Sequence, residues 1–286
     1  MKFIEGMIFD EERALYGSDG VGLKNCRFEG ERDGESAFKE SRNISTEKCY
    51  FNLRYPFWHD DAVSITECEM TELCRAALWY SRDIDIKRSL LHGIKALREC
   101  EKIRICDSDI ISTEFGWFSK DITMKNTSSS GEYFMFRAEK LNFENVSLKG
   151  KYSFQYITDS TFENCNFDTK DAFWHAKNIT VKNSIIKGEY LGWYCENVTF
   201  ENCVISGTQP LCYCKGLKLI NCRMDGADLA FEKSEVDATV TSEMISIKNP
   251  TSGKICVPRV QELIIDDENS KCVLEIGDDN NERKTN

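Results

Sequence analysis

The sequence predicts an all-β protein: a parallel β-helix of about twelve coils, mostly of 19 residues each, with capped ends. The pattern apolar-x-Asn-(Cys/Ser), as in Phe200-Glu201-Asn202-Cys203, recurs at steps of 23, 19 and 21 residues and then seven times at 19. Two further apolar positions accompany each copy, and no helical period of 3.6 residues runs through the repeats. A unit this short cannot bury a core alone, so it must stack on its neighbours.

The last residue of the pattern, here called the anchor, sets the register of each coil. The anchors are Cys26, Cys49, Cys68, Ser89, Ser108, Thr127, Val146, Cys165, Ser184, Cys203 and Cys222. Residues three before and two after the anchor are mostly apolar, which predicts two short strands per coil with these side chains inward. Asn precedes the anchor in six consecutive coils and predicts a left-handed bend and a ladder of stacked Asn. Gly recurs four residues after the anchor and predicts a second turn with positive φ.

The period assigns residues 14–234 to regular coils of one structural domain. Residues 1–13 are predicted to cap the N-terminal edge, because an exposed strand edge invites further pairing. Residues 235–277, where the period fails, are predicted to form irregular terminal coils and a C-terminal cap. Residues 278–286 are predicted to be a polar tail.

Composition excludes several classes of function. The chain has 286 residues with a formal net charge of −11, and such a chain repels phosphate, so nucleic acid is not an expected partner. The sequence shows neither a basic stretch followed by an apolar one at the start nor an apolar run of membrane-spanning length, so a soluble cytoplasmic protein without a membrane partner is expected.

The 14 Cys are interpreted as reduced packing residues, because six of them are anchors and three more share a second column of small residues eleven after the anchor. The pair Cys212 and Cys214 lacks the spacing of a zinc half-site. No metal site and no cofactor are therefore predicted.

The third segment of each coil carries an aromatic motif, as in Phe57-Trp58-His59-Asp60. All five Trp share one position of the repeat, here called the tryptophan column: Lys39, Trp58, Trp79, Arg98, Trp117, Phe136, Gln155, Trp174, Trp193, Cys212 and Phe231. The next position, here called the adjacent column, holds Glu40, His59, Tyr80, Glu99, Phe118, Arg137, Tyr156, His175, Tyr194, Tyr213 and Glu232. Charged members have no place in a narrow core, so we expect the tryptophan column to face outward. An inward tryptophan column is the alternative, because Gly116 and Gly192 each stand directly before a Trp.

An outward aromatic stripe predicts a binding surface, and flat rings interleaved with polar groups suit sugar rings. Arg98 is predicted to lie between Trp79 and Trp117 as a cation between two rings. The ligand-binding candidates are Trp58, His59, Trp79, Tyr80, Lys95, Arg98, Glu99, Trp117, Trp174, His175 and Trp193. Extra residues in the two long coils, 29–35 and 71–76, favour the N-terminal half of the stripe, because insertions in repeat proteins commonly line the functional face. Polar candidates there include Asp61 and Glu72, and the catalytic candidates are His59, Asp60, Arg75 and Glu99.

Several segments, among them Tyr55-Pro56-Phe57-Trp58-His59, residues 92–100 and Asp171-Ala172-Phe173-Trp174-His175, resemble the bacterial family named domain of unknown function 3737. The resemblance covers nearly the whole chain. It implies a single-stranded right-handed β-helix of the pectate-lyase type, and no activity is established for the family. The more distant lyase and polygalacturonase signatures Asn-Thr-Asp, Gly-His-Gly and Arg-Ile-Lys are absent.

Three functions remain open from the sequence. The first is a β-helix that binds a saccharide or similar polar ligand along the stripe. The second is a carbohydrate-active enzyme of the lyase or glycoside hydrolase type, which needs the four catalytic candidates to converge on one cleft. The third is a structural homo-oligomer that uses the stripe as its interface.

Overall fold

The structure, a computed structural model that describes residues 2–30 and 35–277, consists of strands and turns, and its described residues contain no helix. Strands pair in parallel with strands one turn away, in about 14 turns of about 19 residues. This is the right-handed parallel β-helix that the sequence predicts, and the number of turns is close to the predicted twelve. The chain divides into two compact units, Met1–Gly150 and Lys151–Asn286.

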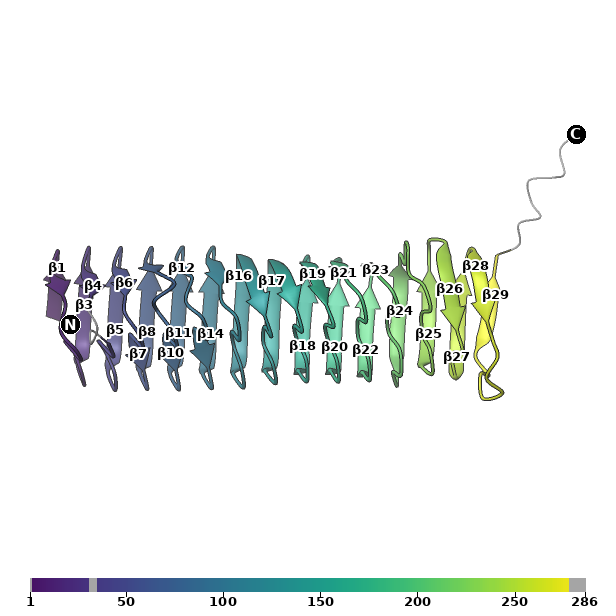
Figure 1. The fold of residues 1–286 in the computed structure, drawn as a ribbon, viewed down its shortest axis with the longest axis horizontal. Coiled ribbons are helices and arrows are strands. Elements are labelled where there is room, and N and C mark those ends of the chain that lie inside the picture. The colour runs from purple at the N-terminus through teal and green to yellow at the C-terminus, as the bar shows by residue number, and fades with distance from the viewer. Residues whose placement is uncertain (1, 31–34, 278–286) are drawn as a thin grey trace, which may run out of the picture. The chain divides into compact units, whose positions relative to one another are not determined.

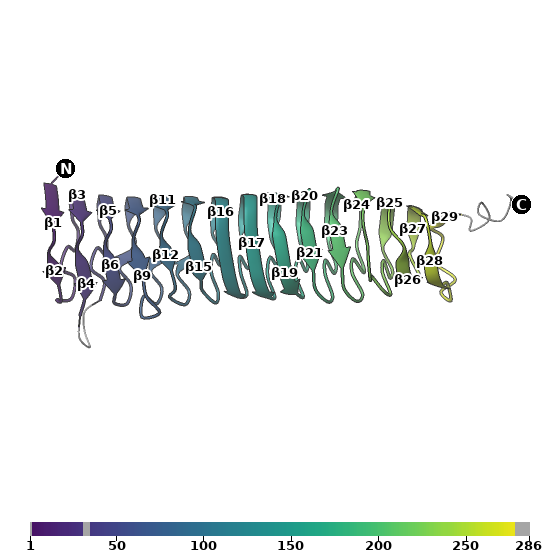
Figure 2. The same ribbon diagram turned by 90° about the horizontal axis from the view of Figure 1, so that it is seen from above.

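In the first unit, two ladders of strands run from coil to coil, as Figures 1 and 2 show. The first ladder consists of β1 (Lys2–Glu5), β3 (Asp19–Lys24), β5 (Arg42–Glu47), β8 (Asp61–Thr66), β11 (Arg82–Lys87) and β14 (Glu101–Cys106). The second consists of β2 (Ile8–Phe9), β4 (Arg27–Glu29), β6 (Tyr50–Asn52), β9 (Glu69–Met70), β12 (Leu90–Leu91) and β15 (Asp109–Ile111). A longer strand, β16 (Lys120–Glu132), pairs with both β14 and β15, and β17 (Glu139–Lys151) follows it. Residues 2–9, within the predicted cap, form β1 and β2, which pair in parallel with β3 and β4.

The second unit repeats this arrangement (Figure 1). Its first ladder consists of β18 (Thr158–Glu163), β20 (Lys177–Lys182), β22 (Glu196–Glu201), β24 (Leu217–Cys222), β25 (Glu235–Val240), β27 (Ser252–Val257) and β29 (Val273–Ile276). Its second consists of β19 (Asn166–Lys170), β21 (Ile185–Lys187) and β23 (Val204–Ser206), and β26 (Met244–Lys248) pairs with β28 (Val260–Ile264). The predicted polar tail and residues 31–34 of the first insertion lie outside the described residues.

The core lies inside the coils, where the sequence pattern places it. The residues three before and two after every anchor from Cys26 to Cys222 are buried. Rings stack from coil to coil within each unit, as Phe28 on Phe51 (centroids 4.9 Å apart) and Phe154 on Phe173 (5.0 Å). Burial of these side chains supplies the main stabilisation of each coil, since a fully buried aromatic or branched side chain contributes about 1.5–3 kcal/mol.

The anchor side chains fill a tight corner and also form hydrogen bonds between coils. The backbone N–H of Cys68 donates to Ser89 Oγ (3.0 Å), and the N–H of Ser89 donates to Ser108 Oγ (3.1 Å). Each hydroxyl in turn donates to the carbonyl two residues earlier in its own coil, as Ser89 Oγ to Lys87 O (2.8 Å). Ser, Thr and Cys recur at this position because a small side chain that both accepts and donates satisfies buried backbone groups.

The predicted turns form, with one correction to the reason for Gly. The Asn residues before the anchors have φ near +50°, and Asn145 Nδ2 donates to Asn126 Oδ1 (2.8 Å) within the predicted ladder. Gly131 has φ of +150°, but Gly93 has no positive φ. A Cβ at Gly93 would lie 2.1 Å from the Cys74 carbonyl oxygen, so Gly is required there by close approach of the neighbouring coil rather than by its own dihedral.

Candidate functional site

The tryptophan column faces outward at its five Trp, whereas Gln155, Cys212 and Phe231 of the same column are buried. The position before it is fully buried, as for Phe57, Leu78 and Leu97 at 0% exposure, whereas the side chains of all five Trp are partly exposed. Only three coils of the first unit form a strand here: β7 (Phe57–Trp58), β10 (Leu78–Trp79) and β13 (Leu97–Arg98). In the coils from Trp117 to Cys212 the preceding residue is left-handed, with φ of +78° at Gly116 and +66° at Gly192. These two Gly therefore reflect backbone conformation and not an inward Trp.

Several coils of the column are tied to the next coil by a side-chain N–H. Trp79 Nε1 donates to Lys95 O (2.6 Å), and Trp117 Nε1 donates to Tyr133 O (2.7 Å). In the second unit, Trp174 and Trp193 make the same bond to Tyr190 O and Gln209 O, and Gln155 Nε2 replaces an indole by donating to Asp171 O. The column therefore has a structural role in addition to any binding role, because these bonds satisfy carbonyls of left-handed turn residues.

Trp58 departs from this rule. Its Nε1 is buried and has no hydrogen-bond partner among the described residues. The next coil carries the insertion at residues 71–76, which lengthens the turn that would otherwise present the matching carbonyl.

In the first unit the predicted cation between rings is confirmed. The Arg98 Cζ atom lies 5.2 Å from the centroid of Trp79 and 5.6 Å from that of Trp117. It also lies 5.5 Å from the ring of Phe118, and Lys39 Nζ lies 5.6 Å from the ring of Trp58. Lys95, another predicted residue, forms an ion pair with Glu114 (3.0 Å).

The adjacent column of the same unit holds rings at His59, Tyr80 and Phe118, with Glu99 between the last two. His59 stacks on Tyr80 with centroids 4.8 Å apart, the next member is Glu99, and the one after it is Phe118. Glu99 and Phe118 are exposed, and Arg98 Nε lies 3.4 Å from Glu99 Oε1. An open hollow of about 560 Å³ lies at Glu99, lined by Arg98, Glu99, Cys100, Glu101, Phe118 and Lys120.

In the second unit the rings cover each other's faces. Tyr156, His175, Tyr194 and Tyr213 form an unbroken stack with centroids 4.8, 5.0 and 4.9 Å apart. Trp174 and Trp193 are parallel, 5.4 Å apart with an interplanar angle of 5°. A sugar needs an open ring face, and here the coil spacing matches the ring-stacking distance, so edges rather than faces meet solvent. His175, which lies between Tyr156 and Tyr194, therefore offers no open ring face, and Trp174 and Trp193 each lose one face to the other.

The four catalytic candidates do not converge. Asp60 is 2% exposed and lies in the inward column of small residues, where its Oδ1 accepts from the N–H of Ser41 (2.9 Å). Burial raises the pKa of this carboxyl to about 8. Arg75 is exposed in the inserted turn, and the coil of Tyr80 separates His59 from Glu99. Asp61 forms an ion pair with Arg82 (2.6 Å) on the outer face of the first ladder.

Sequence reasoning missed a polar chain on the outer face of the second ladder. His92 Nε2 lies 2.9 Å from Asp109 Oδ2, and Asp109 Oδ1 accepts from Ser128 Oγ. Beside it is a hollow of about 400 Å³, lined by Glu72, His92, Ile94, Ile111, Ser112, Thr113, Ser130 and Gly131. The signal in the sequence is the register, since His92 is three after its anchor and Asp109 is one after the next.

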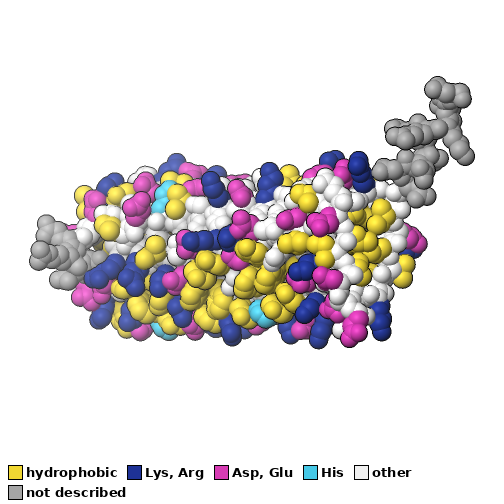
Figure 3. All heavy atoms as spheres, turned by 45° about the vertical axis from the view of Figure 1, so that its right-hand side comes forward, with side chains coloured by type: hydrophobic (Ala, Val, Ile, Leu, Met, Phe, Trp, Pro, Cys, Tyr) yellow, Lys and Arg dark blue, Asp and Glu magenta, His cyan; other side chains and the backbone are white. Residues whose placement is uncertain are grey.

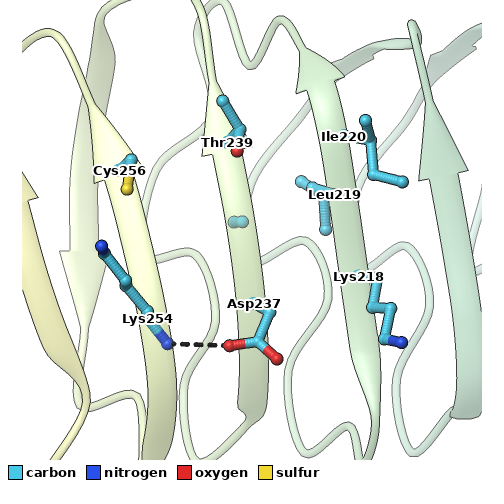
Figure 4. Close-up of a pocket in the computed structure, with 8 residues that line it drawn as sticks. Lys218, Leu219, Ile220, Asp237, Thr239, Lys254 and Cys256 are labelled. Carbon is cyan, nitrogen blue, oxygen red and sulfur yellow. Dashed lines mark hydrogen bonds between the residues drawn. The ribbon is translucent and has the colours of Figure 1, made fainter.

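A further hollow, of about 340 Å³, lies on the outer face of β24, β25 and β27 in the second unit (Figure 4). The Lys254 N–H donates to Asp237 Oδ1 (3.2 Å), and Lys254 Nζ pairs with Glu275 (2.8 Å). The register shifts between Leu219 and Cys222, which opens the surface here. None of the site residues predicted from the sequence lines this hollow.

Figure 3 shows one face on which hydrophobic side chains gather in patches, with Lys, Arg, Asp and Glu around them. Among the described residues, no three His, Cys, Asp or Glu side chains are grouped so as to hold a metal ion. No helix in residues 2–30 or 35–277 is long and apolar enough to cross a membrane.

A family model described as "Protein of unknown function (DUF3737)" matches residues 2–276. The chain belongs to this family. No curated protein matches the chain. The family description names no activity, so the function of this member has to be argued from its own residues.

Solved structures with some likeness include three proteins. The catalytic domain of a GH87 α-1,3-glucanase in complex with nigerose is 11% identical with a TM-score of 0.36, over 94% of this chain and 58% of the glucanase domain. The A-module of the Azotobacter vinelandii mannuronan C-5 epimerase AlgE4 is 11% identical with a TM-score of 0.29, over 95% of this chain and 86% of the module. The Streptococcus pneumoniae surface protein and adhesin PfbA is 9% identical with a TM-score of 0.27, over 91% of this chain and 77% of the adhesin. Scores this low carry no argument about what this chain binds.

Proposed function

We propose that the first unit binds a saccharide in the hollow beside Phe118, over Arg98 and Glu99. The observation that supports this most is the hollow at Glu99, which stands at a position that His59, Tyr80 and Phe118 fill with rings. Tyr80 and Phe118 are two coils apart, which is about 9–10 Å from the usual strand spacing. A puckered pyranose ring is thicker than an aromatic ring, so the wider spacing at Glu99 suits a sugar that lies against Phe118.

The polar groups around the hollow suit hydroxyls, which both donate and accept. Arg98 and Lys120 supply donors, while Glu99 and Glu101 supply acceptors. Their ion pairs are loose, with 3.4 Å between Arg98 Nε and Glu99 and 3.6 Å between Lys120 Nζ and Glu101. Bonds of this length are easily exchanged for shorter bonds to a ligand.

Binding is measured by calorimetry and by tryptophan fluorescence across a panel of neutral and acidic oligosaccharides, since Trp79 and Trp117 both contact Arg98. For the saccharide that binds best, Phe118→Ala is expected to weaken affinity at least about tenfold, as loss of a central aromatic contact usually does. Glu99→Gln removes the charge but keeps the shape, and a loss of about three- to tenfold is expected. The matched control is Tyr194→Ala in the second unit, whose faces are covered by His175 and Tyr213, and it should leave affinity unchanged.

Two results would contradict the proposal. If a saccharide binds but Phe118→Ala and Glu99→Gln leave its affinity within about twofold, the hollow is not the site. If no saccharide in the panel binds and sedimentation shows a concentration-dependent dimer that Phe118→Ala disrupts, the same surface is an oligomer interface.

A further inference from the structure

The hollow beside His92 shares no lining residue with the proposed saccharide site, and its construction is specific. One wall is the inserted turn at residues 71–76, which is held in place by several contacts. Thr71 Oγ1 lies 2.5 Å from Asn52 Oδ1, Cys74 Sγ donates to Phe51 O (3.0 Å), and the Cys74 carbonyl packs against Gly93 where any Cβ would clash. This turn is therefore a fixed ridge, and it brings Glu72 to the edge of the hollow.

The hollow is also lined by an oriented imidazole, that of His92. Asp109 is a carboxylate acceptor, so His92 Nε2 carries the proton of the 2.9 Å hydrogen bond between them. In a neutral imidazole, this leaves Nδ1 as an acceptor on the ring that lines the hollow. Ser128, by donating to the other oxygen of Asp109, holds the carboxylate that orients the ring.

The floor is apolar and the lining contains no cation. Ile94 and Ile111 are 44% and 48% exposed and both line the hollow, so they offer apolar surface to a ligand. The lining residues include Glu72 but no Lys or Arg, and the whole chain carries a formal charge of −11. Acceptors beside an apolar floor, in a negative field, select a ligand that donates hydrogen bonds, carries positive charge and has an apolar part.

We propose that this hollow binds a small organic ammonium ion with an apolar substituent. The ammonium group donates to Glu72 and to His92 Nδ1, and the substituent lies on Ile94 and Ile111. Glu72 and Ile111 are the specificity-determining residues, because one recognises the charge and the other the apolar part. Asp109 is a positioning residue that acts through His92.

The test uses the full chain, with n-butylammonium chloride as the probe. Binding is followed by calorimetry and by the NMR signals of the His92 imidazole, and a Kd of about 1–10 mM is expected for so small a ligand. Methylammonium, which lacks the apolar part, and butan-1-ol, which lacks the charge, should each bind at least about fivefold more weakly. Glu72→Gln should weaken butylammonium binding at least about tenfold, and Ile111→Ser, which copies Ser130 of the next coil, at least about fivefold.

The control variant is Glu69→Gln, the same charge change on an exposed residue of β9 outside the hollow, and it should leave the Kd within about twofold. Asp109→Asn should change the His92 signals in the free protein and also weaken butylammonium binding, because Asp109 holds the imidazole in position. If Asp109 had only a structural role, the His92 signals would not change. Butan-1-ol binding as tightly as butylammonium, Glu72→Gln without effect, or no saturation and no shift of the His92 signals would each overturn the proposal.

Discussion

Replacing Asp60 with Asn is expected to remove a large pH dependence from the stability of the first unit. Other members of this inward column accept from a backbone N–H and donate to the carbonyl one coil back, as Ser41 Oγ does to Leu15 O and Ser81 Oγ to Phe57 O. Asp60 Oδ1 accepts from Ser41, but Oδ2 is buried and has no hydrogen-bond partner among the described residues. By register, the carbonyl that Oδ2 would reach is that of Phe38. Only a protonated carboxyl can donate to it, so Asp60 fits this column as a neutral acid.

The magnitude follows from the pKa. Burial raises the pKa of Asp60 from 3.8 to about 8, a difference of about four units. Because the folded pKa is the higher one, the unfolded chain releases the proton first, and stability falls as pH rises from about 4 to about 8. At 1.36 kcal/mol per unit, the loss over that range is about 5 kcal/mol, and about 3–4 kcal/mol of it falls between pH 5 and pH 8.

The assay is urea denaturation of both proteins at pH 5 and pH 8. Asn carries one acceptor and one donor group like the neutral acid, yet it does not titrate, so Asp60→Asn should be about as stable as the parent at pH 5 and clearly more stable at pH 8. Asp61→Asn is the control, because the hydrogen bond from Arg82 lowers the pKa of Asp61 and its contribution has the opposite sign, being lost on acidification. Parallel pH profiles for the parent and Asp60→Asn would refute the reasoning.

Two further variants test the contacts between coils. Gly93→Ala should lower the free energy of unfolding by about 3 kcal/mol, because its Cβ would lie 2.1 Å from the Cys74 carbonyl oxygen. Gly17→Ala, whose Cβ would have no atom within 4 Å, should lower it only by the left-handed penalty of about 1–2 kcal/mol. Urea midpoints that fall equally in the two variants would contradict this. Trp174→Phe keeps a ring against Trp193 but loses the bond to Tyr190 O, at about 0.5–1.5 kcal/mol. Trp58→Phe, whose indole N–H has no partner among the described residues, should cost less, and an equal loss in thermal stability would show that the N–H bonds are not what matters.

Much of the local chemistry could be predicted because the β-helix is periodic. Once the anchors are aligned, in-register stacking makes a column in the sequence a column in space, so Arg98 could be placed between Trp79 and Trp117 before any coordinates. The same alignment also put Asp60 eleven after its anchor, in the inward column of Cys100 and Cys195. As a catalytic candidate next to Asp61, Asp60 was expected on the aromatic face instead. The register was the stronger signal.

Other features depend on rotamers and insertions that the period does not specify. The pairing of His92 with Asp109 is diagonal between coils, so it depends on which way two side chains turn. The hollow beside them also depends on how two extra residues pack against Gly93. Neither the His92–Asp109 pair nor the hollow can be found by comparing residues at one position of the repeat.

The sequence by itself determined the fold and the coil register, because 19-residue units can bury a core only by stacking on one another. It left both an outward and an inward tryptophan column open, and the structure decided for the outward one. Only the tertiary structure decided which rings remain open to a ligand. Rings spaced by the coil rise stack on each other and present their edges, as in the second unit, and a face is exposed only where a side chain such as Glu99 interrupts the stack.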